Sequence, residues 1–167
     1  RILAKILLVI LVLGAVTAIP AAYFAVVQGP NAITMIDGLG LLLVAFLAFK
    51  LGIPVRIRAG FLVAAFYVVG VWYLVTVGLV SQIYLLAFPV LTAVFIGMRP
   101  AFFALALNGI TLVLLGYSSN ANLHIRSIEQ LPMAKWVMIS LNFTFVDAVL
   151  TISTAILLQK LERSLEA

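Results

Sequence analysis

Six apolar stretches, separated by short breaks, make up most of this chain and restrict what it can fold into. They cover residues 5–27, 32–50, 59–78, 82–98, 101–117 and 135–158. A hydrocarbon core of about 30 Å needs roughly 20 apolar residues per helix, and each stretch is close to that length. Glycine and proline occupy most of the breaks, as turns require. We therefore predict an all-α integral membrane bundle of six transmembrane helices.

The composition agrees with this class and excludes others. Hydrophobic residues make up 66% of the chain and charged residues 9%, whereas a soluble domain carries about 25% charged residues. There is no cysteine, there is one histidine, His124, and the carboxylates are not clustered, so we predict neither disulfides nor a metal site nor a cofactor. The ten Lys and Arg residues are scattered at the ends of apolar stretches rather than gathered in a run, which argues against a nucleic-acid partner.

The basic residues instead predict the orientation of the spans. Only Arg126 and Lys135 fall on one side of the membrane under this assignment. The other eight fall on the opposite side: Arg1, Lys5, Lys50, Arg56, Arg58, Arg99, Lys160 and Arg163. Because cytoplasmic loops carry the excess of Lys and Arg, we expect both termini in the cytoplasm. Amphipathic rings near the outer ends of the spans are expected in the membrane interface, namely Tyr23, Tyr84, Tyr117 and Trp136.

A few polar side chains inside the apolar stretches are the candidate functional residues. Asp147 lies near the middle of the last stretch, where an Asp costs roughly 2.5 to 3.5 kcal/mol to insert. Three interpretations stay open for it: a hydrogen bond that holds the bundle together, ligand or proton sensing, and a relay in transport. Asn142 lies on nearly the opposite side of that helix from Ser140, so we expect the helix to pack centrally. Asn108 in the fifth stretch is a reasonable partner for one of the two faces, and Asp37 in the second could line a shallow pocket or lie at the interface.

One face of the last stretch continues in phase beyond the membrane. Ser140, Thr144, Asp147, Thr151 and Thr154 share this face with Leu158, Leu161 and Leu165. At about 100° per residue, all eight positions stay within roughly 60° of one line. The leucines are spaced three and four apart, which fits the a and d positions of a coiled coil. A single helix with this pattern could carry a conformational change from the lipid to the cytoplasm.

The pattern of Gly, Pro and Arg also resembles a known class. The relevant residues are Gly78-Leu-Val-Ser81, Pro89, Gly97-Met-Arg-Pro100, Gly116-Tyr117, Leu131-Pro132 and Trp136. The chain resembles the multi-span membrane input domains of bacterial sensor histidine kinases and diguanylate cyclases, which include the membrane-associated sensor (MASE-type) domains. The resemblance implies a location in the bacterial inner membrane and a last span that continues into a signalling helix. In that class this helix pairs across a homodimer and joins a cytoplasmic kinase or cyclase module.

We therefore interpret residues 1–158 as a membrane sensor domain and residues 159–167 as the start of a signalling helix. The expected cue is a lipid or hydrophobic small molecule, sensed by Asp147, Asn142, Asn108 and Asp37. The chain carries no kinase or cyclase motif, so we expect no catalysis within it. Since it begins at Arg1 and ends in helix-forming sequence, we expect it to be a piece of a longer protein. The alternatives are a small transporter with Asp147 as a proton or ion site, and an accessory subunit that scaffolds other membrane proteins.

Overall fold

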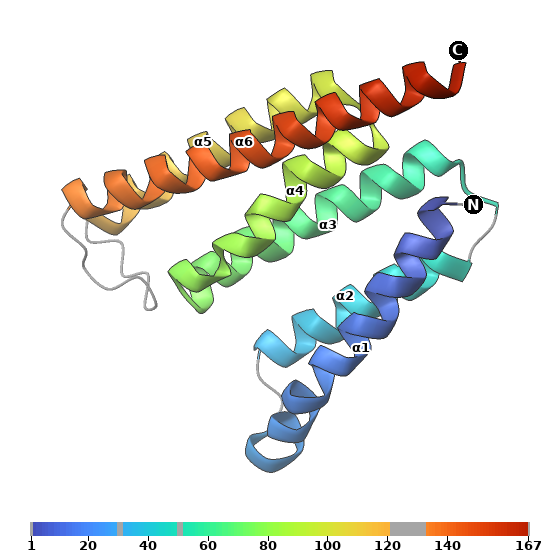
Figure 1. Cartoon of the computed structure of the whole chain (residues 1–167). Helices are drawn as coiled ribbons and strands as arrows, with labels where there is room; N and C mark the ends of the chain where they lie inside the picture. Colours follow the sequence, from blue (N-terminus) through green and yellow to red (C-terminus); the bar gives the residue numbers. More distant parts are fainter. Residues whose placement is uncertain (1, 30–31, 50–51, 121–132, 167) are drawn as a thin grey trace. The chain divides into compact units, whose positions relative to one another are not determined.

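All regular secondary structure in the described part of the chain is helical in a computed structural model (Figure 1). The structure describes residues 2–29, 32–49, 52–120 and 133–166, and these contain no strand. The elements are α1 (Ile2–Gln28), α2 (Ala32–Phe49), α3 (Val55–Thr76), the 3₁₀ helix η1 (Leu79–Ser81), α4 (Gln82–Phe95), α5 (Met98–Asn120) and α6 (Met133–Glu166). Each predicted apolar stretch corresponds to one α-helix, so the all-α fold class is confirmed. The connection that contains His124, residues 121–132, lies outside the described residues.

Two helices begin earlier than the sequence analysis predicted, and each has a proline at or near its start. α3 begins at Val55 rather than at residue 59, so Arg56 and Arg58 lie in its first turns rather than before the helix. The carbonyl of Pro54 accepts hydrogen bonds from the N–H groups three and four residues on, at 3.0 and 3.1 Å. α5 likewise begins before Pro100, which lies in its first turn. Proline is tolerated there because the first N–H groups of a helix have no helical partner to lose.

Glycines end α3 and α4. Gly78 has φ 108° and Gly97 has φ 119°, a backbone conformation that L side chains rarely adopt. Their N–H groups donate to the carbonyls of Tyr73 and Thr92, at 3.1 and 3.0 Å. α4 therefore stops at Phe95 after 14 residues, a length of roughly 21 Å. The predicted span 82–98 is too long at its C-terminal end.

Three of the helices are long and apolar enough to cross a membrane. The candidate spans in the described residues are Val55–Thr76, Met98–Ser118 and Met133–Leu161. The shorter apolar helices there are Leu7–Val16, Thr34–Phe49 and Leu79–Phe95. The chain is therefore a helical membrane protein, while the six-span topology and the side of the termini stay predictions.

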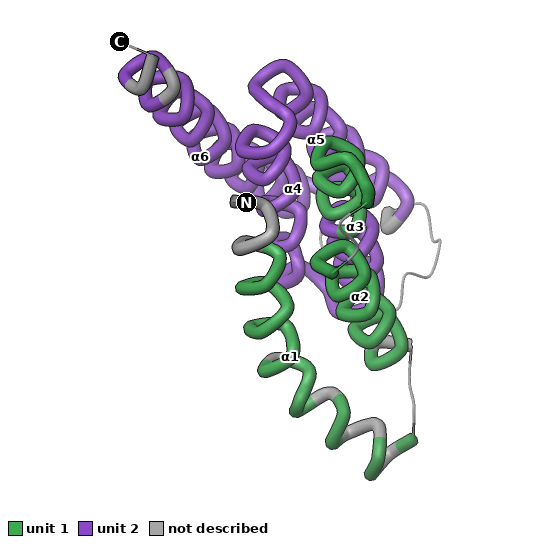
Figure 2. Tube along the Cα trace, turned by 90° about the vertical axis from the view of Figure 1, so that its right-hand side faces the viewer, with its two compact units in different colours: residues 1–65 green, residues 66–167 purple. Residues whose placement is uncertain are grey.

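The chain divides into two compact units, residues 1–65 and residues 66–167 (Figure 2). In the first unit α1 packs against α2. The helices approach closely at Gly14, where a Cβ atom would lie 2.9 Å from the side chain of Leu41. A residue larger than glycine at this position would require the leucine to move.

Arg58 is a buried basic residue of the first unit. Its guanidinium donates to the carbonyl of Ala48 in the last turn of α2, at 3.2 Å. The last carbonyls of a helix have no helical N–H partner. The Arg58 side chain therefore caps the C-terminal end of a neighbouring helix.

In the second unit α4, α5 and α6 pack against one another (Figure 1). Leu74, Leu85 and Leu112 are fully buried and form one apolar cluster of this unit. α6 is a single helix of 34 residues, roughly 51 Å long, and so exceeds the thickness of a hydrocarbon core by about 20 Å. It is unbroken between Thr154 and Leu161, where the last apolar residues give way to charged ones.

Candidate functional site

The site begins with a carbonyl that α4 itself leaves without a partner. Pro89 lies inside α4 and has no N–H, so it cannot donate to the carbonyl of Leu85 four residues earlier. A side-chain amide from α5 takes that role, because Asn108 Nδ2 donates to the Leu85 carbonyl at 2.7 Å. The proline in one helix therefore creates a hydrogen-bonding position for the asparagine of the next.

The same amide joins α5 to α6. Asn108 Nδ2 also donates to Oδ2 of Asp147, at 2.8 Å. The hydroxyl of Thr151 lies 3.5 Å from the other carboxyl oxygen, at the long limit for a hydrogen bond. Asp147 is 0% exposed and Asn108 is 1% exposed. We call the set of Leu85, Asn108, Asp147 and Thr151 the polar node, and it links three helices through buried hydrogen bonds.

The polar node is not fully satisfied. Asn108 has used its N–H groups as donors, and its Oδ1 atom is buried without a hydrogen-bond partner among the described residues. On the same face of α6 as Asp147, the hydroxyl of Ser140 is also buried and unpartnered in that part of the chain. Buried polar groups are usually paired, so each exception calls for an explanation. The node offers an acceptor to any donor that could enter.

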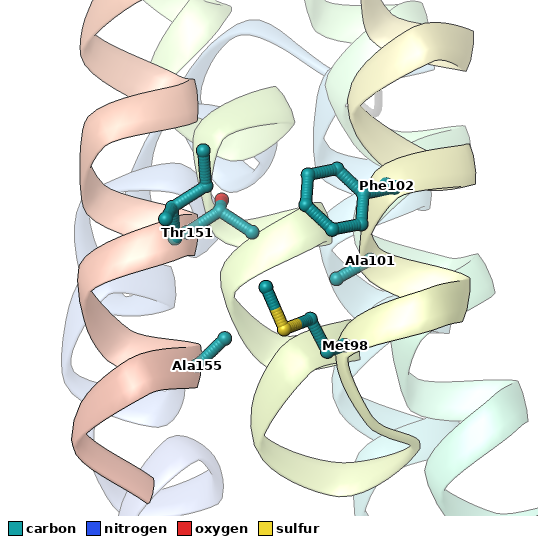
Figure 3. Close-up of a pocket in the computed structure, with 6 residues that line it drawn as sticks. Met98, Ala101, Phe102, Thr151 and Ala155 are labelled. Carbon is teal, nitrogen blue, oxygen red and sulfur yellow. The ribbon is translucent and has the colours of Figure 1, made fainter. Parts of the chain in front are cut away.

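A narrow cleft between α5 and α6 leads to the node (Figure 3). Met98, Ala101 and Phe102 line it from α5, and Thr151, Ile152 and Ala155 line it from α6. The labelled side chains of the two helices point toward one another across the cleft (Figure 3). The cleft does not admit a water-sized molecule. Ala101 and Ala155 contribute small side chains to it from the two helices.

A wider groove adjoins the cleft at Met98 and Ala155. It has a volume of about 260 Å³. Its lining comprises Ala93, Val94, Phe95, Ile96, Gly97, Met98, Ala155, Leu158 and Gln159. Gln159 Nε2 lies 3.3 Å from the sulfur of Met98 and so connects α6 with the start of α5 at this groove. The groove and the cleft together run from the C-terminal part of α6 to Thr151.

Trp136 holds the other end of α6 against α5. Its indole N–H donates to the carbonyl of Leu112 at 2.8 Å, and the residue is 3% exposed. Gly116 makes this approach possible, since a Cβ atom there would lie 2.0 Å from the indole nitrogen. Trp136 is thus buried where α6 packs against α5, and its position near the membrane interface stays a prediction. Tyr23 and Tyr117, by contrast, are exposed.

The structure brings several predicted site residues together on the inner face of α6. Asp147, Thr151 and Ser140 are buried there, and Asn108 meets them from α5. Thr144 and Thr154 are half-buried on the same side, and the hydroxyl of Thr144 donates to the carbonyl of Ser140 at 2.8 Å. The expectation that Asn108 serves as a polar partner for one face of this helix agrees with the contact.

Other predicted residues lie elsewhere. Asn142 is exposed on α6, so within the second unit this helix does not pack centrally. Leu158 lines the groove and Leu161 is exposed, while the side chain of Leu165 lies outside the described part of the structure. Asp37 is half-buried on α2 in the first unit.

The sequence analysis missed the backbone member of the node. The signal that could have found it is Pro89, because a proline inside a helix identifies the carbonyl it leaves free. Over the described residues, no group of three or more His, Asp or Glu side chains could hold a metal ion. The contacts of the polar node are hydrogen bonds between buried groups.

A comparison with protein families decides the class. The family model of MASE11 matches residues 1–161, which include the whole polar node. The chain belongs to the MASE11 family. This confirms the resemblance to membrane-associated sensor domains. MASE domains are sensory input domains rather than catalytic ones, and they are typically linked to cytoplasmic signalling domains. No curated protein and no solved structure matches this MASE11 domain.

Proposed function

We propose that this MASE11 domain detects a lipophilic molecule at the polar node and passes the resulting change through α6 to an attached cytoplasmic kinase or nucleotide cyclase. The observation that carries the proposal is the node itself. It joins α4, α5 and α6 through Asn108, and α6 is one unbroken helix from Asp147 to beyond the apolar residues. A change in how α5 meets α6 at the node would therefore move the cytoplasmic end of the same helix.

The Oδ1 atom of Asn108, which is unpartnered among the described residues, offers a ligand a favourable hydrogen bond. A buried polar atom without a partner costs about 1–3 kcal/mol. A lipophilic molecule with a hydroxyl or N–H group could recover part of that cost by donating to Oδ1, which is buried and unpartnered among the described residues. If the ligand stabilises one packing of α5 and α6 over the other by 1–3 kcal/mol, the ratio of the two populations changes by roughly 5- to 150-fold. This is enough to switch a two-state domain whose resting states are moderately unequal.

The cleft between α5 and α6 is the proposed route of entry. It is closed at rest, and Thr151 at its inner end belongs to the node. An apolar chain that entered between Ala101 and Ala155 would separate the two helices next to the bond between Asn108 and Asp147. Entry from lipid suits this position, since every residue lining the cleft except Thr151 is apolar.

The leucines in the C-terminal part of α6 would report the change. Leu158 and Leu161 continue the Asp147 face of α6, and Leu158 lines the groove together with Phe95, the last residue of α4. Because the helix is continuous, a rotation of α6 at the node turns these leucines by the same angle. We place the domain in a bacterial inner membrane with six spans and both termini in the cytoplasm. The six apolar helices and the uneven distribution of Lys and Arg support that placement.

Insertions in the full-length protein that carries this domain test the transmission. One residue inserted after Leu158 turns everything beyond it by about 100°, whereas seven residues nearly restore the phase. We expect the single insertion to change or lock the output of the attached enzyme and the seven-residue insertion to preserve its response. Equal outputs from the two insertions, at equal protein levels, would contradict signalling through helix phase.

A flux measurement tests the transport alternative. The purified domain in liposomes should show no substrate-dependent or proton flux that depends on Asp147. Flux that is abolished by Asp147→Asn would overturn the sensor proposal and favour a proton- or ion-coupled transporter.

A further inference from the structure

Asn142 presents a polar amide on the outer side of α6. The residue lies within the candidate span Met133–Leu161 and is exposed in the single chain. Among the described residues its side chain has no hydrogen-bond partner. An amide in hydrocarbon without a partner is costly, because nothing in lipid tails can replace its hydrogen bonds. A partner from outside the chain would remove that cost.

α6 is also the least covered of the three long apolar helices. Within its own chain 17% of its apolar window is buried, compared with 33% for the corresponding windows of α3 and α5. The uncovered surface includes a stripe with four- and three-residue spacing, made up of Asn142, Val146, Val149, Ser153 and Ile156. All five side chains are exposed. We call them the outer stripe. At about 100° per residue, the outer stripe lies roughly 100° to 180° around the helix from Asp147.

We propose that a second copy of this chain packs against the outer stripe, with the two Asn142 amides hydrogen-bonded to each other across a two-fold axis. An amide carries both donors and an acceptor, so it is complementary to itself, as a two-fold interface requires. Alternating spacings of four and three residues suit a left-handed crossing of two membrane helices. A different membrane protein would need its own polar group at the same depth, whereas a second copy has one by identity. The proposal uses the membrane placement of the proposed function but depends neither on the cue nor on the polar node.

In this dimer the leucines of α6 do not face the second copy. On a straight helix the centre of the outer stripe lies roughly 140° from the line through Leu158, Leu161 and Leu165. Two α6 helices that meet through Asn142 therefore turn the leucines away from each other. The sequence analysis expected the leucines to pair across a homodimer. The outer stripe makes the contact in the membrane instead and leaves the leucines to face the attached module.

Single-cysteine cross-linking tests the interface, because the chain has no cysteine of its own. Val149→Cys reports on the outer stripe. Leu150→Cys is its matched control, since the two residues are neighbours with similar exposure, 47% and 42%, but point about 100° apart. The full chain in liposomes at low protein density should form oxidative dimers at least fivefold more with Val149→Cys than with Leu150→Cys. Equal cross-linking, or no cross-linked dimer, would overturn the proposal.

The role of the amide needs a second measurement. In the Val149→Cys background, Asn142→Leu should raise the dimer dissociation constant by about five- to thirtyfold, which lowers the dimer fraction by about two- to eightfold at a concentration where the parent is half dimeric. Asn142→Gln should retain most of the dimer because it keeps the amide. An unchanged dimer with leucine would contradict the hydrogen-bonded pair. Cross-linking through Leu161→Cys in place of Val149→Cys would show that the leucines form the interface and would also overturn the proposal. None of these results depends on the enzyme output, so a failed interface is distinguishable from a failed sensor.

Discussion

An N–H group restored at position 89 should make the chain less dependent on Asn108. In the native chain Pro89 cannot donate to the Leu85 carbonyl, and Asn108 donates to it instead at 2.7 Å. In Pro89→Ala the new backbone N–H can close the ordinary helical hydrogen bond to Leu85. The bond from Asn108 then becomes redundant for Leu85, although it still serves Asp147.

The size of the effect follows from counting these bonds. Asn108→Leu in the native chain removes donors from two buried acceptors, the Leu85 carbonyl and the Asp147 carboxyl. Hydrogen bonds between membrane helices contribute on average about 0.6 and at most about 1.7 kcal/mol each. We therefore expect a loss of about 1–3 kcal/mol in the free energy of unfolding. In the Pro89→Ala background only the bond to Asp147 is lost, so the same substitution should cost about 1 kcal/mol less.

A double-mutant cycle measures this difference. The four proteins are unfolded reversibly by detergent titration in mixed micelles, and the coupling between the two sites is taken from the four free energies. Thr111→Val provides a matched control, because Thr111 lies one turn from Asn108 on α5 but hydrogen-bonds to Tyr67 and not to Leu85. The changes in the free energy of unfolding caused by Thr111→Val and Pro89→Ala should add to within about 0.5 kcal/mol. Additivity of Asn108→Leu with Pro89→Ala would refute the conclusion that the asparagine compensates for the proline.

Two further predictions concern the contact between α5 and α6. Gly116→Ala should lower the free energy of unfolding by about 1–3 kcal/mol, because its Cβ would lie 2.0 Å from the Trp136 indole. Gly109→Ala on the same helix should cost nothing, since no atom lies within 4 Å of the added carbon. Equal losses in detergent unfolding would mean that Trp136 does not pack against Gly116. Emission from Trp136 in a Trp72→Phe chain should resist quenching by brominated lipid, whereas Trp72 in a Trp136→Phe chain should be quenched, because they are 3% and 41% exposed. Strong quenching of Trp136 with little quenching of Trp72 would mean that Trp136 faces lipid.

The positions of the helices could be predicted from the sequence because membrane length and apolar runs determine them together. Their ends were harder to predict, since single residues set them through backbone geometry. Gly97, with φ 119°, stops α4 near Phe95 although the apolar run continues. Pro54 begins α3 early enough to bring Arg58 into the helix, against the end of α2. Apolarity alone contains no information about either change.

The candidate site, too, could be predicted only in part from the sequence. The cost of a carboxyl in lipid indicates that Asp147 needs a polar partner, and Asn108 was a recognisable candidate. The Leu85 carbonyl has no side-chain signature of its own, so only the spacing from Pro89 could have indicated it. For Asn142 the sequence gives the angle from Asp147 but not which side of α6 its neighbours cover. That depends on α4 and α5, which the structure places on the Asp147 side.

The two polar groups of α6 constrain how the helix can move. Asp147 is bonded inward to Asn108 within the chain, and Asn142 points outward to the proposed second copy. Since one unbroken helix carries both, a rotation that opens the inner bond also turns the outer amide by the same angle. Two amides that face each other across a two-fold axis tolerate a joint translation along the axis better than a rotation away from it, because hydrogen bonds weaken steeply with misalignment. A dimer held through Asn142 would therefore favour a sliding or tilting of α6 at the node over a rotation. A slide or tilt of α6 still passes through a helix that is seven residues longer and nearly in phase, whereas one inserted residue turns everything beyond it by about 100°. The seven-residue insertion should therefore preserve the response and the single insertion should alter it, whichever motion α6 makes.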